Sequence, residues 1–317
     1  VHRQAEADFY GVKAEIERQG GNITYSRPEF PNRWQRLLGD PGVLNVQKVK
    51  LHNVDSDTNL EHLHELAGMT HSWTLDLNHS GVTDSGLKQL VGLRGLRALD
   101  LGRNYITDRG LDNLSNLTSL RRLQLDATRV TAAGVRSLQR VLPNLSVTPS
   151  PRQLDAMAAI DLSGGEVTLY PHSAVVVKFY RHERSNVTDS IFAHILELAS
   201  LRKWVCLHLG ETRVTDGGLE QLKNMTNLRE LDLCETQISD AGLEHLGGLT
   251  GLTKLSLQGT KVTDAGLLHL NGLAKLGHQP SREEPDGGSL NLIDTEVTKD
   301  GIKRLQDALP DCMIIRH

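Results

Sequence analysis

The chain has 317 residues, a formal net charge of −4 and 38% hydrophobic residues, a length that suits one long repeat domain or two ordinary domains. The slightly acidic balance and the aromatic content of only 4% argue against a nucleic-acid-binding surface. No apolar run approaches the roughly 20 residues that a membrane-spanning helix needs.

The three cysteines, Cys206, Cys234 and Cys312, do not indicate a disulfide framework. Cys206 and Cys234 fall on neighbouring predicted strands, four positions out of register, and at ~3.3 Å per residue they lie beyond disulfide reach. The sequence therefore requires no oxidising compartment, and it leaves the localisation unknown. Because the chain starts at Val1 and not at Met, we expect a fragment or a processed product.

The two halves of the chain begin in the same way. A helix-like stretch at 14–18 leads into Gly20-Gly21, and a similar stretch at 154–159 leads into Gly164-Gly165. Extended, β-branched segments follow at 43–51 and 175–179. Since the end units of a stacked array must seal an exposed core, we predict that both segments are N-terminal caps.

A pair of leucines separated by one residue recurs every 24 residues between the caps. The first leucines of the pairs are Leu75, Leu99 and Leu123 (99 − 75 and 123 − 99), then Leu207, Leu231 and Leu255, and finally Leu290 after an interruption. A fixed period of this size is the signature of a solenoid, in which stacked units share one continuous core.

The hydrophobic spacing changes inside each repeat. Leu75 and Leu77 are two residues apart, which predicts a strand, whereas Leu87 and Leu90 are three apart, which fits a short helix or 3₁₀ turn. A Thr-Asp pair such as Thr83-Asp84 precedes the helical part. We expect its hydroxyl to cap the helix and its carboxylate to favour the positive end of the helix dipole.

A column of small polar residues follows the strands. Its members are Ser80, Asn104, Thr128, Thr212, Thr236 and Thr260. We interpret them as an inward-pointing ladder that bonds to loop backbone, because buried polar groups need partners. A row of threonines for ice or carbohydrate binding is the alternative interpretation.

At this point the chain resembles the leucine-rich repeat family. Leu96, Leu99, Leu101, Asn104 and Ile106 match the family's spacing, and the Thr-Asp-x-Gly-Leu variant is similar to repeats of bacterial members and to the cysteine-containing repeats of F-box proteins. The resemblance implies an α/β solenoid of horseshoe shape, with parallel strands on the concave side and short helices on the convex side. It also implies protein binding, since the family shares no catalytic residues.

The end of each half supports an internal duplication. Residues 138–144 match residues 305–311, so the rear offset is 167 (305 − 138) and the front offset is 144 (164 − 20). The difference of 23 predicts one more repeat in the second array and about nine in all. We assign 1–148 to a cap and first array, and 149–317 to a second cap and array. We prefer two horseshoes with a junction near 146–175, although the sequence also allows one continuous curve.

A polar segment rich in Gly and Pro interrupts the second array at 277–288. Leu276 and Leu290 are 14 residues apart where a spacing of three is expected, so we predict a looped-out insertion. It is either a tolerated surface insertion or a binding loop.

The strand residues that alternate with leucine are predicted to face solvent on the concave side, which is the usual binding surface of a solenoid. This side is polar and almost free of aromatic residues, so Arg103, Tyr105 and Arg122 are its best anchors. The candidate partner-binding residues are Asp76, Asn78, Asp100, Arg103, Arg122, Gln124, His208, Glu230, Asp232, Lys254 and Gln258.

Cys206, His208, Asp232 and Cys234 also suggest a metal site or a nucleophile. Parallel strands spread these residues over more than ~10 Å, whereas zinc ligands converge within ~2.3 Å of one point. Cys206 and His208 stand about 6–7 Å apart along one strand, too far for a catalytic pair. We therefore predict no metal, no cofactor and no enzymatic activity.

The predicted function is a non-enzymatic scaffold that binds a protein partner of unknown identity through its concave face, without nucleic acid or a membrane span. One alternative is a repeat ectodomain or spacer of a larger chain. Another is a substrate-recognition module similar to F-box leucine-rich repeat receptors, although residues 1–19 are too short for an F-box.

Overall fold

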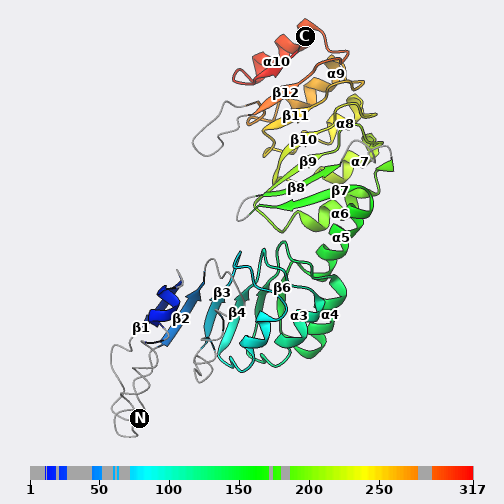
Figure 1. Ribbon diagram of the computed structural model, residues 1–317. Helices are drawn as coiled ribbons and strands as arrows, with labels where there is room; N and C mark the ends of the chain where they lie inside the picture. Colours follow the sequence, from blue (N-terminus) through cyan, green and yellow to red (C-terminus); the bar gives the residue numbers. More distant parts are fainter. Residues whose placement is uncertain are drawn as a thin grey trace. The chain divides into compact units, whose positions relative to one another are not determined.

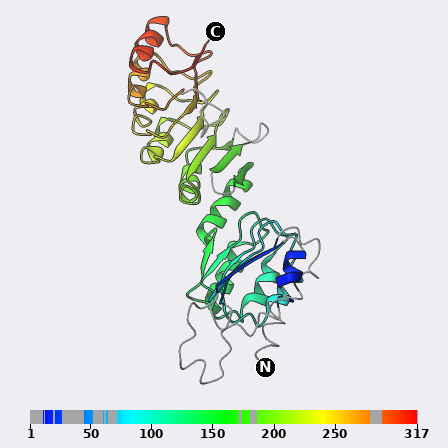
Figure 2. The same ribbon diagram turned by 90° about the vertical axis from the view of Figure 1, so that its left-hand side faces the viewer.

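The computed structural model describes residues 11, 13–18, 21–26, 45–51, 60, 63, 72–170, 174–179, 186–277 and 288–316. The chain divides into two compact units, residues 1–154 and 155–317. Each unit has its own sheet and its own hydrophobic core. In both units the helices gather on one side of the sheet (Figures 1 and 2).

The first unit contains a six-stranded sheet. An antiparallel hairpin of β1 (Asn22–Ser26) and β2 (Asn45–Lys50) starts it, and every later pair is parallel. The later strands are β3 (Trp73–Asp76), β4 (Leu96–Asp100), β5 (Arg122–Gln124) and β6 (Ser146–Thr148). A helical stretch at residues 13–18 precedes β1, and the later helical segments are η2 (Gly86–Leu90), α3 (Asp108–Leu111), η3 (Asp112–Leu114) and α4 (Ala132–Val141).

The second unit repeats this plan with a seven-stranded sheet. An antiparallel hairpin of β7 (Gly165–Leu169) and β8 (Ala174–Phe179) precedes the parallel strands β9 (Trp204–His208), β10 (Leu228–Asp232), β11 (Lys254–Ser256), β12 (Ser289–Asn291) and β13 (Ile314–Ile315). The helical segments are α5 (Pro151–Leu162), α6 (Ile191–Leu198), α7 (Asp216–Leu219), η5 (Glu220–Leu222), α8 (Asp240–Glu244), α9 (Asp264–Leu267), η6 (Leu268–Leu270) and α10 (Lys299–Ala308).

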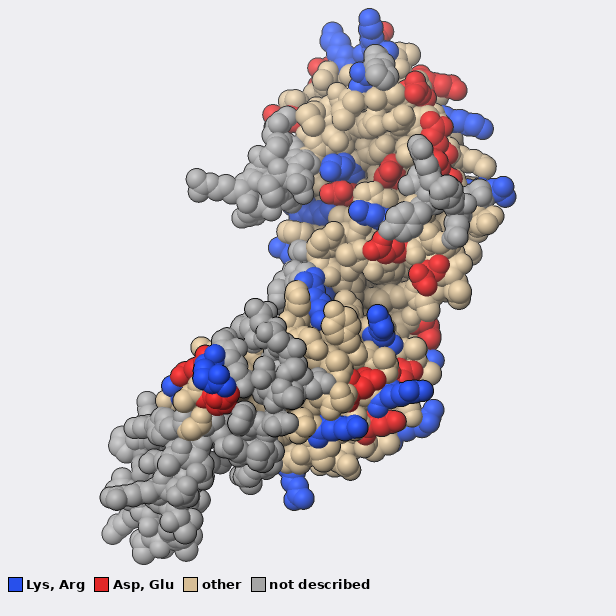
Figure 3. Space-filling view, viewed as in Figure 1, with Lys and Arg blue, Asp and Glu red and all other residues tan. Residues whose placement is uncertain are grey.

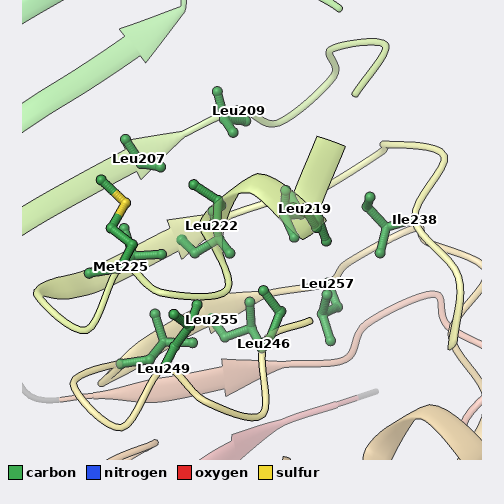
Figure 4. Close-up of a cluster of buried hydrophobic side chains, with 14 of the residues drawn as sticks. Leu207, Leu209, Leu219, Leu222, Met225, Ile238, Leu246, Leu249, Leu255 and Leu257 are labelled. Carbon is green, nitrogen blue, oxygen red and sulfur yellow. The ribbon is translucent and has the colours of Figure 1, made fainter. Parts of the chain in front are cut away.

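The repeating leucines form the core, as predicted. Strand residues Leu207 and Leu255 are fully buried and face apolar side chains such as Leu222, Met225 and Leu249 from the helical side (Figure 4). Equivalent leucines of neighbouring repeats pair directly across the sheet, because the parallel register places Leu231 beside both Leu207 and Leu255. The core is therefore continuous along each array, and every repeat completes the core of its neighbours.

The small polar column is buried except at Thr128, which is half-buried, and each member makes a hydrogen bond, which confirms its structural interpretation. The hydroxyl groups of Thr212, Thr236 and Thr260 donate to the carbonyl oxygen three residues earlier, at 2.5, 2.6 and 2.5 Å. Asn104 does more, since its Nδ2 donates to the carbonyl of Leu77 at 2.7 Å and its Oδ1 accepts from the amide of Ser80 at 3.1 Å. The column therefore ties each turn to the strand that precedes it.

The Thr-Asp pairs form a second ladder that runs from repeat to repeat. Asp84 Oδ1 accepts from the backbone N–H of Thr107 at 2.8 Å, and Asp84 Oδ2 accepts from the Thr107 hydroxyl at 2.5 Å. The same two bonds join Asp216 to Ser239 and Asp240 to Thr263. They also join Asp108 to Thr131, Asp189 to Thr215 and Asp264 to Thr298.

This ladder adds a second role to the one expected for the aspartates. Asp108, Asp216, Asp240 and Asp264 lie in the first turns of their own helices, as the dipole argument expects, and their carboxylates also hold a residue of the next repeat. The pKa of Asp264 is lowered, first by the hydrogen bond from the Thr298 hydroxyl, which favours the charged carboxylate. Thr107 and Thr263 cap their helices as predicted, accepting from Arg109 N and Ala265 N. The prediction is wrong for Thr215 and Ser239, whose side chains make no capping hydrogen bond to α7 and α8.

The ladder also explains the glycine of the Thr-Asp-x-Gly-Leu motif. A Cβ on Gly110 would clash with the Asp84 carboxylate, and a Cβ on Gly242 would clash with that of Asp216. Each glycine therefore lets a helix approach the carboxylate of the preceding repeat closely.

The two caps are built alike, consistent with duplication. Ile16 and Ile160, which are 144 residues apart (160 − 16), are both buried. Each lies where a Cβ on the second glycine of the cap, Gly21 or Gly165, would collide with it. At the other ends, α4 and α10 are ten residues long each, and the hydroxyls of Thr131 and Thr298 cap them in the same way. The insertion predicted at 277–288 lies almost entirely outside the described residues.

The glycine pair Gly217-Gly218 tests this packing. A Cβ on Gly218 would overlap Asp189 and Phe192, whereas Gly217 has only one ordinary contact, at 3.7 Å. We expect Gly218→Ala to lower the free energy of unfolding by about 1–3 kcal/mol, because it overpacks the site. Gly217→Ala should instead raise it by about 0.5–1 kcal/mol, because alanine favours the helix. Urea denaturation measures both, and equal effects would contradict the packing role of Gly218.

Leu231 tests the continuity of the core, since it is 1% exposed and lies between Leu207 and Leu255. Leu231→Ala should lower the free energy of unfolding by about 2–5 kcal/mol, because it removes buried methyl groups and leaves a cavity. A loss below about half a kcal/mol in the same denaturation experiment would contradict the core position.

Candidate binding surface

Each sheet has one face that the helices leave uncovered, which we call the open face (Figure 2). In the second unit the parallel register aligns its polar side chains in rows across the strands. Glu230 lies between Cys206 and Lys254 in one row, and Asp232 lies between His208 and Ser256 in the next. The repeat period therefore places residues that are 24 positions apart side by side, as the sequence predicted for His208 and Asp232.

A hollow of about 360 Å³ lies on this open face over β10, β11 and β12. It brings together the five candidate residues of the second unit, which are His208, Glu230, Asp232, Lys254 and Gln258. The sequence missed two further lining residues, Ser289 and Ile315, which β12 and β13 contribute after the interruption of the period.

Charges of both signs line the hollow. Lys254 Nζ and Glu230 Oε1 form an ion pair at 3.8 Å, with side chains 39% and 28% exposed. Such a pair is worth only about 0–1 kcal/mol, so a partner can displace it at little cost. Lys/Arg and Asp/Glu side chains are also interspersed over the visible surface of each unit (Figure 3). The visible surface therefore carries small local groups of charge and not a broad field of one sign.

Two titratable side chains of the open face are held in their neutral forms. Burial, followed by the nearby charge of Lys178, lowers the pKa of His208. Burial, followed by the charge of Glu230, raises the pKa of Cys206 to about 12. At neutral pH the face therefore presents an uncharged imidazole and an unreactive thiol, because the thiolate is the nucleophilic form.

The aspartates of the open face also have a structural task that the sequence did not reveal. Oδ1 of Asp232 accepts from the backbone N–H of Cys234 at 3.0 Å, and Oδ1 of Asp100 accepts from Gly102 at 2.9 Å. An aspartate that bonds the backbone two residues on stabilises a turn. These side chains therefore shape the ends of their strands, and only part of each carboxylate is available to a partner.

In the first unit Asp76 lies beside Asp100 as predicted, but its exposure differs from the prediction. Asp76 is only 9% exposed, so the expectation that it faces solvent is wrong. Lys48 and Lys50 of β2 cover it, with Nζ atoms 3.2 and 3.8 Å from its Oδ2. Asn78 Nδ2 donates to Asp100 Oδ1 at 3.3 Å.

Arg122 and Gln124 are exposed on β5, as predicted. Arg103 lies beyond the end of β4, at the loop edge of the sheet, with φ = 57°.

The cysteines lie as the register predicted. Cys206 pairs with Glu230, which leaves Cys234 four positions further along the chain, and none of the three cysteines forms a disulfide. Within the described ranges, no group of three His, Cys, Asp or Glu side chains is arranged to hold a metal ion. No helix in the described part of the chain is long and apolar enough to span a membrane.

Parallel strands stacked at a 24-residue period, each followed by a short helical segment, define an α/β solenoid of leucine-rich units. The family described as Leucine Rich repeat matches residues 94–115 and 224–247, one stretch in each unit. With the repeat geometry, these matches show that both units contain leucine-rich repeats. No curated protein sequence matches it.

Among solved structures, the chain is similar to two internalins from Listeria monocytogenes. The internalin InlF is 19% identical with a TM-score of 0.31, over 80% of this chain and 56% of that one. The present chain therefore spans little more than half of InlF. Internalin C2 is 20% identical with a TM-score of 0.28, over 90% of this chain and 91% of that one.

The lowered pKa of His208 predicts a pH dependence of stability. Its folded pKa lies below the ordinary value of 6.5, so the unfolded chain binds the proton first as the pH falls. The contribution of His208 is therefore present above about pH 6.5 and is lost as the pH falls through the folded pKa. We expect His208→Gln to lose less stability than the wild type between about pH 7.5 and 5.5 in urea denaturation. Identical losses would contradict a buried, neutral imidazole.

Proposed function

We propose that this leucine-rich repeat protein is a non-enzymatic scaffold that binds a protein partner through its open sheet face. In this proposal the protein partner makes its principal contact in the hollow over β10, β11 and β12. The observation that carries it is the convergence of five candidate side chains from neighbouring strands on a face that none of the described helices covers. The proposal includes a horseshoe curvature with this face on the concave side, about nine repeats, and a division into 1–148 and 149–317.

The chemistry of the hollow favours a polar segment of a protein. Lys254 offers a cation, Glu230 offers an anion, and Gln258 and Asn291 form an amide pair at 3.2 Å that can exchange partners. Ile315, which is 40% exposed, adds an apolar edge. A surface that combines donors, acceptors and both charges suits the mixed side chains of a protein surface.

The hydrogen-bond ladders beneath the open face support binding of a partner without a rearrangement of the backbone. The strand leucines, the threonine column and the Asp–Thr bonds immobilise the backbone on which these side chains stand. A rigid scaffold loses little conformational entropy when it binds. The neutral Cys206 thiol, with its pKa raised to about 12, supports a binding role over nucleophilic chemistry.

Reversing one charge in the hollow tests the proposal. A partner is captured from the native source and identified by mass spectrometry, and its dissociation constant is then measured with purified proteins. We expect Lys254→Glu to weaken binding on the order of tenfold, because it places a second carboxylate beside Glu230 in the interface.

Lys223→Glu is the matched control. Lys223 is 54% exposed and pairs with Glu220 at 3.2 Å, so the same charge change is made at a similar ion pair next to η5, away from the open face. Binding should change less than about twofold in this variant. Equal losses in the two variants, or none in Lys254→Glu, would reject the hollow as the binding surface.

A further inference from the structure

Three side chains of the first unit form a second exposed group, at the loop edge beyond β4 and β5. Tyr105 N donates to the Val82 carbonyl at 3.0 Å, and Arg129 N donates to the Ile106 carbonyl at 2.9 Å. These bonds are equivalent in consecutive repeats, so Tyr105 and Arg129 stand about one strand spacing (~4.8 Å) apart. Arg103 N donates to the Asp126 carbonyl at 2.7 Å and completes the group, which we call the Arg-Tyr rim.

The side chains of the Arg-Tyr rim point into solvent without being paired. Tyr105 is 64% exposed, the most exposed aromatic side chain among the described residues. Arg103 and Arg129 are also exposed, and within the described part of the chain their guanidinium groups contact no hydrogen-bonding or ionic partner. An aromatic ring beside unpaired arginines has the composition of an interface hot spot.

The ladder carboxylates of these repeats bond to threonines and not to the arginines of the rim. Both oxygens of Asp84 bond to Thr107, and both oxygens of Asp108 bond to Thr131. The rim therefore keeps two positive charges on a fixed backbone.

The second unit shows that the fold itself does not require this group. Glu235 takes the repeat position of Arg103, with φ = 53° against 57°, so the same strained left-handed backbone carries the opposite charge there. Gln237 and Lys261 take the positions of Tyr105 and Arg129 in two consecutive repeats. The Lys261 amide donates to the Ile238 carbonyl at 3.0 Å, which is the bond that Arg129 makes in the first unit. The two units therefore share the backbone at these positions, and only the side chains of the first unit form the Arg-Tyr rim.

We propose that the Arg-Tyr rim binds an acidic segment of a protein partner, as a site separate from the hollow of the second unit. The guanidinium groups of Arg103 and Arg129 bind carboxylates through paired N–H groups. The Tyr105 ring packs against the aliphatic part of the same segment. Because the charges are exposed, affinity falls as the salt concentration rises.

The test titrates the full chain with a fluorescein-labelled acidic peptide of glutamate and leucine, followed by fluorescence anisotropy at low and high salt. We expect Arg129→Glu to weaken binding on the order of tenfold, and Tyr105→Ala to weaken it several-fold without changing the charge. Lys261→Glu is the matched control, since it makes the same charge change at the same repeat position of the second unit, and it should alter binding less than twofold.

Two outcomes would overturn the proposal. One is the absence of binding by the wild-type chain at about millimolar peptide, the weak limit for specific recognition. The other is an equal loss in Arg129→Glu and Lys261→Glu together with unchanged binding by Tyr105→Ala, which would indicate attraction by net charge alone. Lys254→Glu leaves peptide binding unchanged if the two surfaces are separate, so failure at the rim and failure at the hollow are distinguishable.

Discussion

The bonds from one aspartate to the capping threonine of the next repeat are the constraint on which each array depends. The two oxygens of Asp216 hold both the backbone and the hydroxyl of Ser239, and Gly242 must lack a side chain for the helix to come this close. A helix of four or five residues has too few internal bonds to be stable alone. Each repeat therefore receives the acceptor for its helix start from its neighbour, and only the stack is stable.

Because the ladders and the core hold the fold together, the side chains of the open face can vary. The leucines and the threonine column hold the strands from below, so a side chain such as Lys254 or Gln258 can change without loss of a core contact. The exception lies at the strand ends, where Asp100 and Asp232 each bond a backbone amide two residues on. These aspartates stabilise turns whether or not they also contact a partner. Substitutions at Glu230 and Lys254 are therefore better tests of binding.

The two units share one backbone architecture but present different surfaces. The second unit has a hollow lined by both charges, and the first has an exposed Tyr105 between two unpaired arginines. At the position of Arg103, the second unit carries Glu235 with nearly the same backbone angle. The caps of the two units are thus built alike, while the residues outside the ladders differ. We infer that the two arrays recognise different chemistry.

The sequence by itself determined the repeat period, the strand-to-helix alternation, the core leucines, the polar column and five of the residues that line the hollow. These follow from short-range patterns, because side chains two apart share a strand face and side chains three or four apart share a helix face. Only the tertiary structure decided that Lys48 and Lys50 bury Asp76, because that contact depends on the register between β2 and β3. The same holds for Ser289 and Ile315, which follow a break in the period, and for the ladder aspartates, whose partners lie 23 or more residues away. Contacts between repeats are set by stacking, and stacking is a property of the folded array.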